Sequence, residues 1–566
     1  MTHYRAPVDE MRFVLNEVAG LARLEDDLAL ETANDEVTKT VLDEAGKFAD
    51  AKWAPINKTG DQTGAVLENG VVRTAPGFKE AYQEFAEAGW NGAVFEADHG
   101  GQDLPWATQM ALTEIWNAAN MALAVCPLLT QAGIDALVHW GTDAQKATYL
   151  EKLVSGEWTA AMCLTEPHAG TDVGALRTKA VPEGDHYRIS GTKIFITYGE
   201  HDMADNIIHL VLARLPGAPN GTKGITLFIV PKFIPDDDGA PGERNDMRCV
   251  SIEHKLGMKA SPTCVMSYGD HDGAIGYLIG KEHGGMQAMF TMMNNARIAV
   301  GIQGLGIAER AYQAARTYAH ERVQGRVGGQ PVTIAAYPDM QRRLMAMKTQ
   351  IAGMRALCYW AGTYLDRELR ETEPQAKALA QERAALLTPI VKAWCTDLSI
   401  EITSDAVQCH GGMGFVEETG VAQHYRDARI LPIYEGTNAV QATDLIGRKL
   451  AMRDGALVAE LIAELRAEVT VGDPPELAHA LDALEAATAT LRARIDDEGV
   501  LGAQAAAAPY LTLFGYVTAT LLLARGARTG RADWVQMLRF QISNLLPPAL
   551  ALQSAITERA SWQEVA

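Results

Sequence analysis

The stretch His186-Tyr-Arg-Ile-Ser-Gly191-Thr-Lys-Ile-Phe-Ile-Thr197 marks a β-rich region in an otherwise helical chain. It is rich in β-branched and aromatic residues on both sides of Gly191, which predicts a strand, a turn and a second strand. Two further apolar runs, 207–213 and 224–231, are typical of buried strands. We therefore expect a β domain over residues 159–280, inserted between helical regions.

The residues before this domain favour helices. We expect several short helices over residues 1–50. Residues 51–75 are rich in Pro and Gly, which predicts loops. From Gly77 to Trp158 helical spacing returns, with Phe78, Tyr82 and Phe85 on one face. A turn at His99-Gly-Gly-Gln102 precedes a long apolar helix.

The residues after the β domain also predict helices, near 286–325, 337–370 and 375–409. An Ala- and Leu-rich tail past residue 450 has breaks near 471–475, 499–502 and 526–530, which indicates an up-and-down bundle of about four helices. The expected fold is mainly α with an inserted β domain. The predicted domains are 1–158, 159–280, 281–455 and 456–566.

Composition narrows the class of protein. The chain has 566 residues, 48% hydrophobic and 21% charged, which is too long for a single core. Its net charge of −21 argues against a nucleic-acid partner, because binding to a phosphate backbone needs a basic face.

The cysteines and the apolar runs indicate a cytoplasmic protein. Seven cysteines are scattered without a C-x-x-C pair, so reduced thiols are expected rather than disulfides or a zinc site, and no metal is expected. The first ten residues contain no apolar core of signal-peptide length. No run approaches the roughly 20 apolar residues that would span a membrane.

Glu435 is the candidate for acid–base chemistry. It lies in Ile430-Leu-Pro-Ile-Tyr-Glu435-Gly436-Thr437-Asn438, between Tyr and Gly. A partly desolvated carboxylate among small residues can approach a ligand and act as a general base. By residue type alone, an ordinary surface Glu on a turn is the more common case.

Six motifs in fixed order decide between these interpretations. They are Cys163-Leu-Thr-Glu-Pro-His-Ala-Gly-Thr-Asp172, Lys193-Ile-Phe-Ile-Thr197, Lys255-Leu-Gly-Met-Lys-Ala-Ser-Pro-Thr263, Glu321-Arg-Val-Gln-Gly325, Gln408-Cys-His-Gly-Gly-Met-Gly414 and Tyr434-Glu-Gly-Thr437. With the helical, β and helical order, they resemble the acyl-CoA dehydrogenase family of flavoproteins over residues 50–450. That resemblance implies a helical N-domain, a barrel-like β domain, a four-helix C-domain and FAD as cofactor.

The resemblance assigns the first two motifs to the flavin ring. Gly170 permits a close backbone approach, and the hydroxyls of Thr165 and Thr171 can bond the polar edge of the ring. Phe195 stands where the family usually has a Trp packed on the flavin, and Thr197, on the same strand face, would bond flavin N5. Without the other motifs, Phe195 would be an ordinary core aromatic on a strand.

Other residues are implied to bind the rest of FAD. Arg322 and Gln324 resemble the pair that contacts the pyrophosphate of the neighbouring subunit, a role suited to a forked guanidinium. The other implied contacts are Gln408, Gly411, Gly412 and Thr437. Gly411-Gly412 could also be a plain helix-ending turn.

Family chemistry is α,β-dehydrogenation of an acyl-CoA thioester. The resemblance makes Glu435 the catalytic base and its backbone N–H a donor to the thioester carbonyl. Some members carry their base on another helix, at a position that corresponds here to Ala296, which cannot act as one. The implied substrate-side residues are Thr171, Arg297, Tyr434 and Gly436.

The chain departs from the family pattern at two places. Tyr337-Pro338-Asp339 replaces a common Phe-Gln, which removes the usual Gln contact to the partner's FAD, and Pro338 suits the first position of a helix. The tail beyond about 455 is absent from short members. Long members with such a tail tend to be homodimers.

The resemblance also implies a substrate class and an electron acceptor. The long form, with Tyr4-Arg-Ala-Pro-Val-Asp9, Pro55-Ile-Asn57 and the turn at His99, is similar to a subgroup that oxidises a short thioether acyl-CoA. A general short- or medium-chain acyl-CoA dehydrogenase is the alternative. More distant alternatives are an acyl-CoA oxidase and a DNA-binding flavoprotein without enzymatic activity. The implied acceptor is electron-transfer flavoprotein.

Overall fold

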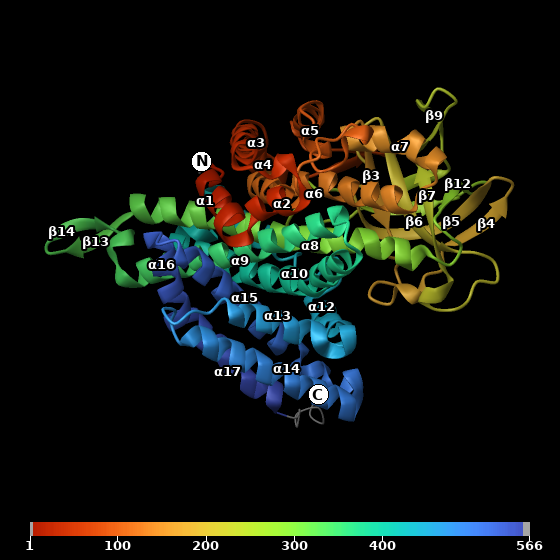
Figure 1. Ribbon diagram of the computed structural model, residues 1–566. Coiled ribbons are helices and arrows are strands. Elements are labelled where there is room, and N and C mark those ends of the chain that lie inside the picture. Colours follow the sequence, from red (N-terminus) through yellow and green to blue (C-terminus); the bar gives the residue numbers. More distant parts are fainter. Residues whose placement is uncertain (1–3, 559–566) are drawn as a thin grey trace, which may run out of the picture. The chain divides into compact units, whose positions relative to one another are not determined.

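The computed structural model describes residues 4–558 (Figure 1). Residues 1–3 and 559–566, at the ends of the first and last predicted domains, lie outside this range. The chain divides into two compact units. Unit 1 comprises Met1–Lys47, Pro105–Ala118 and Arg297–Ala566, and unit 2 comprises Phe48–Leu104 and Ala119–Ala296.

Unit 1 is built on long helices. Helices α9 (Pro338–Arg370) and α10 (Pro374–His410) are joined by a short turn and pack along each other. Pro338 begins α9, as predicted, because its fixed φ suits the first helical position. The remaining helices before the tail are α1 (Val8–Phe13), α2 (Leu21–Leu28), α3 (Asp35–Phe48), α11 (Val421–Ala428), α12 (Asn438–Asp444) and the parts of α6 (Trp106–Trp140) and α8 (Gly285–Glu321) that belong to this unit.

A buried ion-pair network ties three of these helices together. Arg355 on α9 donates to Glu114 on α6 and to Glu309 on α8, the latter at 2.9 Å. The Tyr359 hydroxyl donates to Glu114 at 2.6 Å. Buried charges are tolerated only where such partners replace water, so this network specifies one register of the helices.

The tail forms five helices within residues 456–558 rather than about four (Figure 1, blue): α13 (Ala456–Ala467), α14 (Glu476–Ala503), α15 (Ala507–Arg528), α16 (Ala532–Phe540) and α17 (Leu546–Thr557). The predicted breaks at 471–475 and 526–530 are confirmed. The break near Gly499 is a kink inside α14, with φ +72°. The last predicted helix is divided into α16 and α17 by an irregular helical turn at Gln541–Leu545. Pro547 follows in the first turn of α17, where proline is compatible with a helix.

Unit 2 contains the predicted β domain. Its sheet has eight strands in the order β10-β11-β5-β12-β7-β6-β3, with β4 pairing to β5 and β6. Strands β6 and β7 are the two predicted apolar runs, and both are almost entirely buried. The sheet strands are β3 (Trp158–Cys163), β4 (Lys179–Glu183), β5 (His186–Thr197), β6 (Asn206–Arg214), β7 (Ile225–Pro231), β10 (Met247–Ile252), β11 (Thr263–Tyr268) and β12 (Ala274–Ile279).

Strand β5 corrects the prediction of a strand, a turn and a strand. It is one continuous strand through Gly191. Residues before Gly191 pair with β4 and β12, and residues from Gly191 onward pair with β11. A Cβ at Gly191 would lie 2.5 Å from the Thr178 hydroxyl, so glycine is required by close packing and not by a turn.

Residues 51–75 also differ from the prediction, because much of this loop-rich segment is helical. Helix α4 (Ala54–Thr63) has Pro55 in its first turn, where proline is compatible with a helix. Gly60 lies under Phe78, and a Cβ there would come within 2.8 Å of the ring. Proline and glycine here predicted loops, but Pro55 fits the first turn of α4 and Gly60 allows the helix to pack.

The other elements of unit 2 are short hairpins and helices: β1 (Val66–Glu68), β2 (Val71–Arg73), β8 (Phe233–Pro235), β9 (Pro241–Arg244), α5 (Phe78–Glu87) and α7 (Asp143–Ser155).

Two stretches in the described residues, Trp106–Trp140 and Glu476–Arg528, have the length and apolar composition of membrane spans. The expectation that no run is apolar enough was therefore too strict. However, 89% and 78% of their most apolar windows are buried inside the protein, which is typical of core helices.

Candidate functional site

Glu435 lies in a turn with two consecutive left-handed residues, between α11 and α12. Its φ is +54°, and that of Gly436 is +81°. Left-handed backbone costs a residue with a Cβ roughly 1–2 kcal/mol, so the surroundings have to stabilise it. The turn is closed by the backbone N–H of Asn438, which donates to the Pro432 carbonyl at 3.0 Å.

Side chains from three helices bond the carbonyls of this turn. Arg297 Nε on α8 and Gln441 Nε2 on α12 donate to the Glu435 carbonyl at 3.4 and 3.3 Å. Lys392 Nζ on α10 donates to the Gly436 carbonyl at 2.9 Å. Both peptide groups that follow Glu435 are therefore fixed from inside unit 1.

The electrostatics around Glu435 suit a general base. Burial raises the pKa of the Glu435 carboxyl, while the nearby cations Arg297 and Lys392 act in the opposite direction. The Lys392 side chain is fully buried, and burial lowers its pKa to about 7. These opposing effects bring a carboxylate toward the range in which it can accept a carbon-bound proton near neutral pH.

The neighbours of Glu435 have structural partners. The Tyr434 hydroxyl donates to Gln303 Oε1 on α8. Thr437 is the N-cap of α12, where its hydroxyl accepts from the Val440 N–H at 3.3 Å. Ala296, the position that corresponds to the alternative base, is buried.

In unit 2, the first motif is braced by a buried carboxylate that the sequence analysis gave no role. Glu166 accepts from the backbone of Arg177 and Thr178 at 2.7 and 3.0 Å and from Lys193 Nζ at 2.9 Å. The Thr165 carbonyl accepts from the Ile194 N–H at 2.9 Å. These bonds bring the first two motifs together. In the sequence, the only signal for this contact is that Glu166 lies in the first motif and Lys193 in the second.

Phe195 lies at an irregularity in β5. Between Cys264 and Met266 on β11 the register shifts by an extra residue on β5, and Phe195 has φ +58°. Its side chain is 59% exposed, whereas Ile196 beside it is buried. The bulge therefore presents an aromatic face to solvent, which an ordinary core aromatic would not do. Thr197 is partly exposed two residues on.

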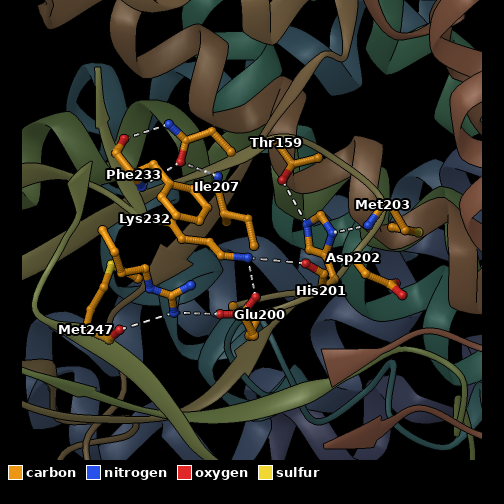
Figure 2. Close-up of polar contacts among 12 residues, drawn as sticks. Thr159, Glu200, His201, Asp202, Met203, Ile207, Lys232, Phe233 and Met247 are labelled. Atoms are coloured by element: carbon orange, nitrogen blue, oxygen red, sulfur yellow. Dashed lines mark hydrogen bonds and ion pairs between the residues drawn. The ribbon is translucent and has the colours of Figure 1, made fainter. Parts of the chain in front are cut away.

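The chain after Thr197 is anchored by buried polar contacts (Figure 2). Glu200 accepts from Lys232 and, at 3.2 Å, from Arg244. His201 lies 2.9 Å from the Thr159 hydroxyl and accepts from the Met203 N–H at 3.2 Å (Figure 2). This charged cluster makes the exposed end of β5 a rigid platform rather than a mobile loop.

Two further predicted cofactor motifs lie in unit 1. Helix α8 ends at Glu321, earlier than predicted. Gln324 therefore lies in the exposed hairpin of β13 (Val323–Val327) and β14 (Gln330–Thr333), and Arg322 lies just before β13 (Figure 1). The Tyr337 hydroxyl donates to the Gln324 carbonyl at 3.1 Å.

The glycine turn of the fifth motif follows α10. Gln408, Gly411 and Gly412 are exposed, and a Cβ at either glycine would meet open space. Gly411 is also the C-cap of α10, with φ +58°, so it ends the helix as well. Tyr318 stacks on His410 with ring centroids 4.3 Å apart, which brings the end of α8 next to this turn.

The exposed positions in both units fit a flat, anionic cofactor. In unit 2, Gly170 and Thr171 are exposed next to the braced first motif, and Phe195 offers an uncovered ring. In unit 1, the open glycine turn leaves space for a group to approach the backbone closely. Within residues 4–558, no group of three or more His, Cys, Asp or Glu side chains is arranged to hold a metal ion.

Comparison with known proteins identifies the family. The N-terminal, middle and C-terminal domains of acyl-CoA dehydrogenase match residues 35–157, 161–270 and 283–451. The fold and these matches define an FAD-dependent oxidoreductase that acts on CH–CH groups. The chain belongs to the acyl-CoA dehydrogenase family.

Two curated relatives cover most of the chain. It is 50% identical to the 3-methylmercaptopropionyl-CoA dehydrogenase of Ruegeria pomeroyi, over 82% of this chain and 79% of that one. It is 36% identical to the broad-specificity linear acyl-CoA dehydrogenase of Mycobacterium tuberculosis, over 83% and 79%.

Two solved structures share the fold. An acyl-CoA dehydrogenase from Bacillus anthracis complexed with FAD has a TM-score of 0.76 and 22% identity, over 96% of this chain and 90% of that one. A structure described as the electron transferring flavoprotein of Acidaminococcus fermentans has a TM-score of 0.61 and 29% identity, over 74% and 98%.

Proposed function

We propose that the protein oxidises 3-methylmercaptopropionyl-CoA to methylthioacryloyl-CoA, a step in the demethylation route of dimethylsulfoniopropionate breakdown. The observation that carries this choice is the 50% identity to the Ruegeria enzyme over 82% of the chain, against 36% to the broad-specificity relative. The family gives the acyl-CoA dehydrogenase activity itself.

In the proposed reaction Glu435 is the base. Its carboxylate takes the proton from the α-carbon of the thioester, and the β-hydrogen leaves with its electron pair as the α,β double bond forms. FAD, when bound, supplies the two-electron oxidant that accepts this hydride. The raised pKa of Glu435 supports the role, because a weakly acidic α-proton needs a stronger base than an ordinary carboxylate in water.

The same turn offers a donor to the thioester carbonyl. Within the described part of unit 1, the backbone N–H of Glu435 donates to no acceptor. The turn that carries this N–H is held inside unit 1 by bonds to the next two carbonyls, those of Glu435 and Gly436. A prearranged donor of this kind stabilises the enolate-like charge that develops on the thioester oxygen during proton removal.

Phe195 and Thr197 are the proposed flavin contacts of unit 2, with Thr165, Gly170 and Thr171. The bulge and the Glu200 cluster support this assignment, because they hold an exposed aromatic ring on a rigid strand end. Arg322, Gln324 and the glycine turn are the proposed contacts to the phosphates. Arg297 is buried against the turn of Glu435, which favours a role in holding that turn.

The substrate assignment is tested by steady-state kinetics. The enzyme is assayed with 3-methylmercaptopropionyl-, butyryl-, hexanoyl- and octanoyl-CoA. We expect the highest kcat/KM with the thioether ester and measurable activity with butyryl- and hexanoyl-CoA, because one methylene discriminates by only about 1–3 kcal/mol. A clear preference for octanoyl-CoA would contradict the proposal.

A general short- or medium-chain acyl-CoA dehydrogenase is the second candidate. The 36% identity to a relative described as acting broadly on linear acyl-CoA supports it. Equal kcat/KM values for the thioether, butyryl and hexanoyl esters would favour this candidate.

We also propose electron-transfer flavoprotein as the acceptor, a homodimeric assembly and a cytoplasmic location. The first rests on the acyl-CoA dehydrogenase family to which the chain belongs. Seven buried, reduced cysteines are compatible with a reducing compartment. An oxidase would instead release one peroxide per turnover in air, and this yield, compared with reduction of an artificial acceptor, distinguishes the two.

A further inference from the structure

Lys392 is a buried charge without a role in the reaction as described so far. Its side chain is fully buried on α10. Its Nζ donates to the Gly436 carbonyl at 2.9 Å and to Asn438 Oδ1 at 2.8 Å. A buried ammonium costs several kcal/mol unless its surroundings compensate, so an apolar side chain would fill this space at a lower cost in stability.

Asn438 makes the contact specific. Its Nδ2 donates to the Ala393 carbonyl, the Thr396 hydroxyl and Asp397 Oδ1 at 3.2, 2.9 and 2.7 Å. All three acceptors lie on α10, so the amide cannot rotate without losing them. Its oxygen is therefore held toward Lys392, and α10 binds the start of α12 through one side chain.

The two peptide groups after Glu435 have different supports. Arg297 and Gln441 bond the Glu435 carbonyl, at 3.4 and 3.3 Å. Lys392 bonds the next carbonyl at 2.9 Å, the shortest of the three contacts. Because Gly436 has no side chain to restrict its backbone, this second peptide would be the freer one without Lys392.

We propose that Lys392 is a positioning residue for the base, whose ammonium fixes the left-handed Glu435–Gly436 turn by holding the Gly436 carbonyl and Asn438. The inference rests on the proposed role of Glu435. Lys392 itself contacts neither substrate nor cofactor in this proposal. Its effect on the reaction passes through the orientation and the charge of Glu435.

The charge of Lys392 has a second consequence. A cation near Glu435 favours its ionised form, and Lys392 shares this effect with Arg297 from α8. Asp397 on α10 also acts on the charge of Lys392. Asp444 and Arg448 act on the charge of Arg297. Removal of the Lys392 charge alone should therefore raise the pKa of Glu435 and move the acid limb of the kcat/KM profile to higher pH.

The test compares Lys392→Met and Lys392→Gln with the wild type, as full-length FAD-loaded enzymes with butyryl-CoA and 3-methylmercaptopropionyl-CoA. The Met variant removes both bonds and the charge, whereas Gln keeps a donor without the charge. Lys377→Met, an exposed lysine on the same helix, is the matched control. FAD content and thermal unfolding are measured for every variant.

For Lys392→Met we expect kcat to fall about 10- to 100-fold with KM changed less than about threefold, because a misplaced base slows the chemical step more than it weakens binding. Lys392→Gln should recover part of kcat but keep an acid limb raised by about one pH unit. Lys377→Met should match the wild type. Wild-type kcat and an unshifted acid limb in a folded Lys392 variant would overturn the proposal.

The design separates failure of the Lys392 proposal from failure of the proposed function. If Lys392→Met does not fold, the acid limb and kcat of Lys392→Gln decide alone. Glu435→Gln is assayed in parallel. If that variant keeps activity, Glu435 is not the base and the proposed function fails, whereas an inactive Glu435→Gln with wild-type Lys392 variants rejects only the role of Lys392.

Discussion

At the scale of single residues, the reaction is proposed to depend on a carboxylate in a conformation that its own backbone disfavours. Glu435 has φ +54°, and buried donors from three helices bond the turn. The helices thus supply the free energy that offsets a local cost of roughly 1–2 kcal/mol. A glycine at this position would adopt the backbone easily but could not accept a proton.

Replacing the base is the most direct test at this scale. Glu435→Gln preserves size and hydrogen bonding but cannot accept a proton. We expect the variant to retain yellow colour and CoA-ester binding, while kcat falls by at least about three orders of magnitude. Turnover is measured by reduction of an artificial acceptor. Retention of more than about a tenth of wild-type kcat would exclude Glu435 from the role.

Phe195 supports a second prediction at this scale. Removing its ring by Phe195→Ala should weaken FAD binding by about 10- to 100-fold, because stacking of an aromatic side chain on a flat ring is worth about 1–3 kcal/mol. Phe195→Trp should bind FAD at least as well as the wild type. The Kd is measured by quenching of flavin fluorescence on titration of the apoprotein. Leu501→Ala, an exposed apolar residue of the tail, is the control. Equal affinity of Phe195→Ala and wild type would remove Phe195 from the flavin site.

At the scale of elements, strand β5 connects packing to the candidate site. Gly191 lets the strand pass closely over Thr178. The bulge at Phe195 turns this ring outward, while Ile196 beside it stays buried. Beyond Thr197, the Glu200 cluster and the contact of His201 with Thr159 on β3 anchor the chain (Figure 2). His209 on β6 adds a contact to the Gly199 carbonyl. The position of the exposed ring is therefore decided by buried contacts on both sides of it.

The two histidines make this element sensitive to acid. His201 and His209 are fully buried, and burial lowers the pKa of each to about 3. In the unfolded chain their pKa is about 6.5. Below pH 6.5 the unfolded state therefore binds protons that the native state does not, so stability is present above this pH and decreases as pH falls toward 3. Each histidine contributes about 1.4 kcal/mol per pH unit in this window.

We expect the free energy of opening of β6, measured by native-state hydrogen exchange, to fall between pH 7 and pH 5.5. His201→Gln should make this fall shallower, because one titrating group is removed. His320→Gln, an exposed histidine on α8, should leave it unchanged. A pH-independent opening free energy in the wild type would show that these histidines are not neutral in the folded state.

At the scale of the whole molecule, both units are assembled from segments far apart in the sequence. Unit 1 joins the N-terminal segment to the C-terminal half, and its tail packs on α10, where a Cβ at Gly515 on α15 would lie 2.4 Å from the Trp394 ring. The tail thus continues the core of unit 1 and is not an independent appendage.

An assembly prediction belongs to this scale. Met413, Phe415 and Val416 form an exposed apolar patch next to the glycine turn, and Phe415 is 91% exposed. Such a patch is typical of a surface that another subunit covers. Sedimentation should give twice the mass of one chain, and Phe415→Asp should weaken the dimer by at least about tenfold, since it places a charge in an apolar interface. Val471→Asp, in an exposed loop of the tail, is the control. A tetramer, or a stable dimer of Phe415→Asp, would contradict this prediction.

Periodicity and ordered motifs in the sequence determined the broad features of this protein. Long helical spacing, the apolar runs of β6 and β7 and six motifs in order were sufficient for the fold class and the family, because these signals are local or fixed by spacing. The predictions failed where proline and glycine were interpreted without their neighbours. Pro55 lies in the first turn of α4, Gly191 relieves a contact with Thr178, and Gly60 lies beneath a ring.

Only the tertiary structure decided which side chains support the candidate site. Lys392 lies 43 positions before Glu435, and Arg297 lies 138 before it, yet both hold the same turn. Glu166 and Lys193 meet across two motifs. Glu200 meets Lys232, which follows β7, and Arg244 on β9. Such pairs depend on chain crossings and on burial, which bring distant residues into contact without leaving a periodic pattern in the sequence.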